Sequence, residues 1–161
     1  MDHKIAHWIH PLLKTRNESI YTILRISLGI VLLAHGLQKS LGWFGGYGYT
    51  GTMAYFTDTM GLPWVVAFLV ILLETLGAIL LLFGVGTRLI AISITFLAIG
   101  IIVTSHWEFG FFMNWGGNQN GEGFEYFVLW LAISISLIIS GGGSMSFDRY
   151  LYLYLGIETE L

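Results

Sequence analysis

The stretch "LPWVVAFLVILLETLGAILLLF", residues 62–83, decides the fold class of this chain, and Glu74 is its only charged residue. A helix needs about 20 mostly apolar residues to cross the hydrocarbon core of a bilayer. This stretch is long enough to do so. We therefore predict a transmembrane helix here, with one carboxylate buried near its middle.

Three further segments of the same kind lie on either side of it. Residues 20–38 contain one charge, Arg25, while residues 89–105 and 126–147 contain none. Together these runs predict an all-α integral membrane protein, a four-helix bundle that forms a single domain over residues 1–161. The four spans are expected at about residues 20–39, 62–83, 88–106 and 124–143.

The overall composition agrees with a chain that lies mostly in lipid. The 161 residues are 55% hydrophobic and 11% charged, whereas soluble domains carry roughly 25% charged residues. The chain has no cysteine, which excludes disulfides, thiol redox chemistry and iron–sulfur ligation within it. The net charge of −3 gives no sign of a nucleic-acid partner. The lipid bilayer is therefore the first partner that we expect.

Positive charges predict the orientation, because Lys and Arg are enriched in cytoplasmic loops. Lys39 alone lies at the opposite end of the spans from the other cations, which are Lys4, Lys14, Arg16, Arg25, Arg88 and Arg149. We therefore expect a multi-pass protein with both termini in the cytoplasm. The long loops Ser40–Gly61 and His106–Gly121, rich in glycine and aromatic residues, then face outward and are predicted to act as lids.

The first residues, "MDHKIAHWIHPLL", predict a short helix that lies in the membrane interface. Its apolar side chains share one face, and His3, His7 and His10 share the other. A metal site on the histidines is the alternative to a polar face turned toward lipid headgroups. We favour the headgroup-facing interpretation.

Small and polar residues form one stripe along the first span. On a helical wheel the stripe is about 120° wide, and its members are Arg25, Gly29, Leu32, His35, Gly36 and Lys39. Small residues beside polar ones are typical of helix–helix contacts in lipid. At about 1.5 Å per residue, Arg25 and Glu74 come to a similar depth. We therefore predict a buried Arg25–Glu74 ion pair, whose favoured role is to fix helix register.

A second polar group is expected near the outer surface, within about two helical turns of it. Its members are His35, Lys39, His106, Glu122 and Glu125. Because histidine titrates near neutral pH and can bind a carbonyl oxygen or relay a proton, the group is a candidate ligand pocket under the aromatic loops. The alternative is a hydrogen-bond network that anchors the loops. No metal is expected, because Lys39 would repel a cation and no two histidines of the group have ligand spacing.

These residues resemble the DoxX family of small membrane proteins. The resemblance runs from about Tyr21 to Asp148 and rests on the stretches "RISLGIVLLAHGLQK", "GLPW", "LLETLGAILLLFGVGTR" and "SGGGSMSFDRY". It implies a four-helix membrane bundle in a bacterial inner membrane. The positions that match the family's polar pattern are Arg25, His35, Lys39, Glu74, Arg88 and Asp148. Namesake relatives belong to a thiosulfate:quinone oxidoreductase, and other members are described as membrane parts of oxidoreductase complexes.

Three functions are compatible with this sequence. The first is the membrane subunit of a redox system that binds a quinone at the outer pocket, has no cofactor of its own and relies on a partner subunit for the redox centre. The second is a non-catalytic scaffold or assembly subunit of a larger membrane complex. The third, a transporter or channel, would need oligomerisation, because the chain shows no inverted repeat. The sequence does not decide whether the chain is itself an enzyme.

Overall fold

The computed structural model describes residues 10–155, and every regular element in that range is helical. The first long helix is α2 (Ser19–Leu41). The second is continuous through α4 (Trp64–Leu72), the π-helical η3 (Leu73–Gly77) and α5 (Ala78–Phe83). The remaining elements are η1 (Trp43–Gly45), α3 (Gly48–Ala54), η2 (Tyr55–Thr59), α6 (Thr87–Ile101), η4 (Ile102–His106), η5 (Trp107–Phe109), α7 (Glu125–Ser140) and α8 (Phe147–Tyr154). The predicted all-α class is confirmed.

Three of the described helices are long and apolar enough to cross a membrane, and they cover Ser19–Leu41, Trp64–Phe83 and Thr87–Phe109. The fourth predicted span is shorter than expected. Helix α7 has 16 residues, which at 1.5 Å per residue is about 24 Å. It ends at Ser140 because Gly141 turns the chain with a φ of 78°, a conformation that glycine adopts without steric cost.

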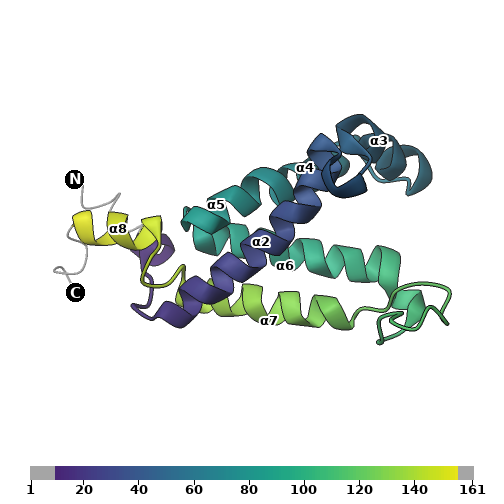
Figure 1. The fold of residues 1–161 in the computed structure, drawn as a ribbon. Coiled ribbons are helices and arrows are strands. Elements are labelled where there is room, and N and C mark those ends of the chain that lie inside the picture. Colours follow the sequence, from purple (N-terminus) through teal and green to yellow (C-terminus); the bar gives the residue numbers. More distant parts are fainter. Residues whose placement is uncertain (1–9, 156–161) are drawn as a thin grey trace.

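The helices form a bundle that is closed at one end and splayed at the other (Figure 1). The turn between α5 and α6 is very short, since Gly84 and Gly86 both take positive φ, and the two helices form an antiparallel hairpin. Helix α2 crosses α4–α5, and α7 runs beside α6. Away from the turn, α4 and α6 diverge, and α3 lies beyond the N-terminal end of α4.

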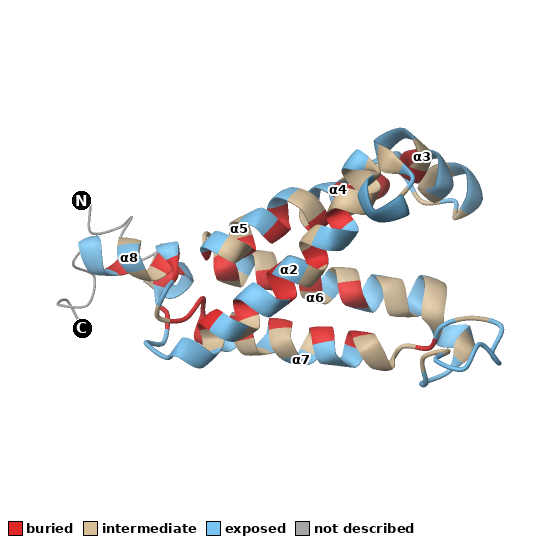
Figure 2. Ribbon diagram, viewed as in Figure 1, coloured by how far each residue is buried: buried red, intermediate tan, exposed pale blue. Residues whose placement is uncertain are grey.

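Burial follows the facing sides of these helices (Figure 2). The apolar side chains of the main core are Leu28, Leu32, Ala78, Leu81, Ala91, Ile94, Ala98, Phe127, Trp130 and Leu137. The outward faces are apolar as well: Ile23, Phe83 and Phe96 are 58%, 68% and 70% exposed. Large exposed apolar surfaces of this kind are rare on soluble monomers, and here they are the surface that meets lipid.

The chain segments before α2 and after α7 meet at the same end of the bundle. The rings of His10 and Tyr152 lie 5.6 Å apart, and residues 10–13 are helical. His3, His7 and most of the predicted interfacial helix lie outside the described residues. Helix α8 was not predicted from the sequence. It turns Phe147, Tyr150 and Tyr154 outward, as a helix at a membrane interface does.

Candidate functional site

A cavity of about 980 Å³ occupies the space between the diverging helices α4–α5 and α6. Most of its lining is apolar, and the charged or imidazole side chains on it are His35, Lys39, Glu74 and His106. Leu69, Leu76 and Phe96 line it while being 52%, 48% and 70% exposed. The cavity therefore opens sideways onto the apolar outer surface of the helices.

All three π-helical segments of the described chain contribute to this cavity. Tyr55 and Phe56 come from η2, Glu74 from η3, and His106 from η4. Single π-helical turns inside α-helices are rare and frequently occur at functional sites. Their clustering around one cavity marks it as the candidate site.

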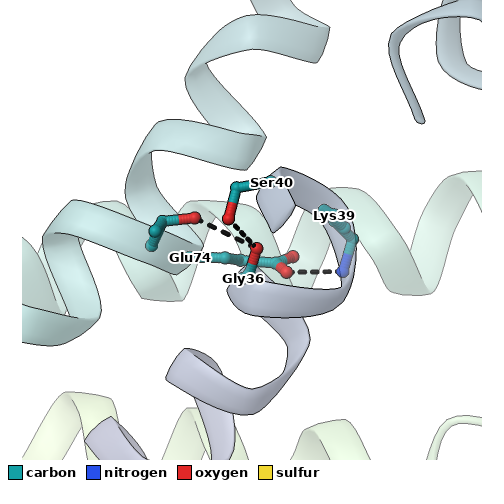
Figure 3. Close-up of polar contacts among 5 residues, drawn as sticks. Gly36, Lys39, Ser40 and Glu74 are labelled. Carbon is teal, nitrogen blue, oxygen red and sulfur yellow. Dashed lines mark hydrogen bonds and ion pairs between the residues drawn. The ribbon is translucent and has the colours of Figure 1, made fainter. Parts of the chain in front are cut away.

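Lys39 and Glu74 form an ion pair at the end of the cavity next to α2. The Lys39 Nζ donates to the Glu74 Oε2 at 2.5 Å, and the side chains are 24% and 2% exposed. Figure 3 shows the two residues facing each other across the contact between α2 and η3. A buried carboxylate is costly in an apolar environment unless it is paired, so Lys39 is what permits Glu74 to lie here in charged form.

The predicted Arg25–Glu74 pair is therefore wrong. The two helices cross at Gly36 and Glu74, and their outer ends are not level. From the crossing, α2 runs about five residues further to Leu41, whereas α4 begins about ten residues further out, at Trp64, a difference of about 7 Å. The prediction assumed level ends and so misjudged the depth of Glu74 relative to Arg25.

Gly36 makes this crossing possible. A Cβ at this position would lie 2.2 Å from the backbone oxygen of Glu74, so only glycine allows the two backbones to come so close. The Gly36 carbonyl accepts hydrogen bonds from Thr75 Oγ1 at 3.2 Å and from Ser40 Oγ at 2.7 Å (Figure 3). The stripe of small and polar residues predicted on the first span is thus a helix–helix contact.

Two histidines line the cavity on other sides. His35 is exposed on α2, and its ring lies 6.4 Å from that of the buried Trp130. His106, in η4, packs its ring 4.8 Å from Phe127 and is hydrogen-bonded through Nδ1 to the backbone oxygen of Glu122 at 2.7 Å. Of the five residues predicted for the outer pocket, the structure thus brings His35, Lys39 and His106 to one cavity.

Glu122 and Glu125 are not part of that cavity. The Glu122 carboxylate accepts from the Asn114 backbone N–H at 2.6 Å. Glu125 Oε1 accepts from the Met113 backbone N–H at 3.1 Å and from the Trp115 indole at 3.0 Å. The backbone N–H groups of Met113 and Asn114 have no backbone acceptor among the described residues, so each needs a side-chain acceptor. For these two residues the alternative of a loop-anchoring network is the one that the structure supports.

Arg25 lies at the opposite end of the bundle. Its Nε donates to Gly142 O at 3.0 Å, Nη2 donates to Met145 O at 2.9 Å, and Nη1 donates to the carbonyls of Leu81 and Leu82. The last carbonyls of a helix lack the usual partners within it, and at the end of α5 Arg25 donates to the Leu82 carbonyl and to the Leu81 carbonyl, which also accepts from the Gly84 backbone N–H. Its role is to join α2, the α5–α6 turn and the segment after α7.

Asp148 has a role that sequence reasoning missed, although its position in the family pattern marked it. Its carboxylate, on α8, accepts from the backbone N–H groups of Gly86 and Thr87 at 2.7 and 2.8 Å. It therefore caps α6 from a different part of the chain, at the helix end where a negative charge is favourable. No local pattern around Thr87 indicates this, because the cap comes from some sixty residues away.

Within residues 10–155, no three His, Cys, Asp or Glu side chains lie close enough together to hold a metal ion. The polar groups of the cavity are two imidazoles, one ion pair and the hydroxyls of Tyr55, Ser93, Thr104, Ser105 and Tyr126. Such a set can bind a neutral ring with oxygen substituents, because it offers hydrogen-bond donors and acceptors beside an apolar wall.

Comparison with known proteins connects the chain to bacterial membrane proteins. The family model described as DoxX matches residues 20–107. "Putative oxidoreductase CatD" of Bacillus subtilis (strain 168) is 30% identical over 130 residues, which are 81% of this chain and 85% of that protein. "Inner membrane protein YphA" of Escherichia coli (strain K12) is 26% identical over 133 residues, 79% of this chain and 86% of that protein. No solved structure matches the chain.

Proposed function

This chain belongs to the DoxX family of membrane proteins, and from that premise we propose that it is the inner-membrane subunit of an oxidoreductase system and binds a quinone. The quinone occupies the cavity between α4–α5 and α6. The observation that carries the proposal is an apolar cavity of about 980 Å³ that opens sideways and has a Lys–Glu pair and two histidines on its wall. The printed name of the B. subtilis relative agrees with a redox role.

The cavity offers a matching surface to the isoprenoid chain, the ring and the carbonyl oxygens of a quinone. The isoprenoid chain lies along the apolar side chains of α4 and α6 and leaves through the sideways opening into lipid. The ring lies beside Phe127 and Trp130, where aromatic stacking contributes about 0.5–1.5 kcal/mol beyond burial. Lys39 donates to Glu74 through one of its three N–H groups and can donate another to a quinone carbonyl. A partner subunit supplies the electrons.

Tryptophan fluorescence tests the proposal. Trp130 is buried beside His35 on the cavity wall, so a short-chain benzoquinone bound there quenches its emission. The protein in lipid nanodiscs is titrated, and a Trp130→Phe variant gives the background from the other tryptophans. We expect the His35→Ala/Lys39→Ala variant to lose saturable quenching, while Glu122→Gln, outside the cavity, keeps it.

Removal of Lys39 alone leaves the Glu74 carboxylate unpaired, and that can unfold the protein. A Lys39→Met/Glu74→Gln variant removes both charges together and is compared after its melting temperature has been checked. Undiminished quinone affinity in both the His35/Lys39 variant and this charge-free variant would refute the proposed site.

A four-pass topology with cytoplasmic termini belongs to the same proposal, with α7 as the short fourth span. The described ends of the chain meet at one end of the bundle, which requires an even number of crossings. Because the chain has no cysteine, single cysteines can report the sides of the membrane. An impermeant maleimide on intact cells should label Asn118→Cys but reach Tyr154→Cys only after permeabilisation. Equal labelling of both from outside would show that α7 does not cross.

A scaffold role is the second candidate, and the outer loops favour it. Trp115 and Tyr47 are 88% and 82% exposed at the end of the molecule away from α8, and Glu122 and Glu125 serve only to hold their loop. Aromatic side chains presented in this way suit contact with another subunit. Co-purification of a stable partner that depends on Trp115, from a protein that binds no quinone, would favour this candidate over the first.

A further inference from the structure

The hydrogen bond of His106 determines which of its nitrogens can meet a ligand. Nδ1 lies 2.7 Å from the backbone oxygen of Glu122. A carbonyl oxygen can only accept a hydrogen bond, so Nδ1 must carry the proton. In a neutral imidazole the other nitrogen, Nε2, is then an acceptor. Nε2 makes no hydrogen bond to any residue between 10 and 155, and His106 lies on the cavity wall.

From this geometry we propose that the cavity prefers the reduced, dihydroxy form of its ligand, a quinol, over the oxidised quinone, because a quinol hydroxyl donates to His106 Nε2. This inference rests on the proposed function and names the redox form that the same site recognises. A quinone has only acceptor oxygens and leaves Nε2 without a partner. A quinol hydroxyl can both donate to Nε2 and accept from a donor such as Lys39.

Glu74 strengthens the preference. It lines the cavity, and its Oε2 accepts from Lys39, but its Oε1 accepts no hydrogen bond from the described residues. A carboxylate oxygen, like Nε2, can be satisfied only by a donor. The cavity thus contains two acceptors of different origin, one on η3 and one on η4. A quinone ring in the cavity would cover these two acceptors without donating to either, and covering one acceptor without pairing it lowers affinity about tenfold or more.

Titration calorimetry on the two redox forms tests the inference. The probe is a benzoquinone with one isoprenyl unit, used oxidised in one series and borohydride-reduced under anaerobic conditions in the other, with the full chain in nanodiscs. We expect the quinol to bind at least tenfold more tightly than the quinone. Equal affinity for the two forms would overturn the inference and leave the proposed function standing. If neither form binds, the proposed function fails and the inference fails with it.

A matched pair of variants assigns the preference to His106. In His106→Asn the side-chain amide N–H can keep the bond to Glu122 O, while the ligand-facing acceptor is lost. We expect the quinol affinity to fall about tenfold and the quinone affinity to stay unchanged. Glu122→Gln keeps the backbone oxygen and serves as the control, with both affinities as in the unmodified protein. A His106→Asn protein that keeps the full quinol preference would show that Nε2 does not bind the ligand.

Discussion

Replacing Gly36 by alanine tests whether the helix crossing depends on the missing side chain. The new Cβ would lie 2.2 Å from the backbone oxygen of Glu74, whereas ordinary contact begins at 3.4 Å. The backbones must therefore separate by about 1.2 Å, because the obstacle is main chain rather than a flexible side chain. A separation of about 1.2 Å would lengthen the distance from Lys39 Nζ to Glu74 Oε2 from 2.5 Å to about 3.7 Å, which is too long for a hydrogen bond.

The expected loss of stability combines two opposing effects. Overpacking of a tight contact costs typically 1–3 kcal/mol, and a clash with backbone belongs at the upper end. Alanine is favoured over glycine inside a helix by about 1 kcal/mol. The net loss is about 2 kcal/mol, which for a chain of this size lowers the melting temperature by about 6 °C.

Thermal unfolding in detergent, followed by circular dichroism at the helix band, measures this loss. Gly100→Ala is the control, because a Cβ at Gly100 meets nothing within 4 Å, and it should melt at the same temperature as the unmodified protein or slightly above it. The melting temperature of Gly29→Ala should fall between the two, since its Cβ would crowd the Leu82 side chain, at 2.8 Å, but lie at an ordinary 3.5 Å from the Ala78 backbone oxygen. If Gly36→Ala melts like Gly100→Ala, the close crossing at Glu74 is not a source of stability.

Three further substitutions test the roles assigned to single side chains. Asp148→Asn, compared with the neighbouring Arg149→Gln, should lower the unfolding free energy by about 2 kcal/mol in detergent melts, because α6 loses its charged cap; an unchanged melt would refute the capping role. Thr87→Val should leave stability unchanged or raise it by about 1 kcal/mol, because the Thr87 hydroxyl is the one buried side-chain polar atom without a partner among residues 10–155; a lower melting temperature would mean that the hydroxyl is satisfied. Glu125→Ala should speed amide hydrogen exchange in the loop between η5 and α7 with little change in the melt, and unchanged exchange would contradict the anchoring of that loop.

The four long apolar helices could be predicted from sequence because each is encoded locally, whereas α8 was missed. Long apolar runs with at most one charge identify the spans, and the glycines at positions 84 and 86 identify the turn between α5 and α6. The depth of Glu74 could not be read in the same way. It depends on where α2 crosses α4–α5, and that crossing is set by the close contact of Gly36 with a π-helical turn, which neither hydrophobicity nor the 100° periodicity reveals.

Only some members of the candidate site could be predicted, because helical spacing is encoded locally and loop contacts are not. His35 and Lys39 lie on a regular helix, so their shared face follows from their spacing. His106 was placed at the correct end of its span, but the directions of Glu122 and Glu125 depend on a loop that folds back over them. Their partners are the backbone N–H groups of Met113 and Asn114 and the Trp115 indole, and no periodicity encodes such contacts.

The two ends of the bundle use their charges in different ways, and the proposed ligand site lies at the end whose charged groups keep bonding capacity. At the closed end, Arg25 donates to four backbone carbonyls and Asp148 accepts from two backbone N–H groups. The hydrogen bonds of these two charged side chains all join parts of the chain to one another. At the splayed end, Lys39 donates to one carboxylate oxygen and has two N–H groups left. Helices held rigidly at one end and spread at the other leave a cavity whose polar groups still have bonding capacity, which is what binding requires.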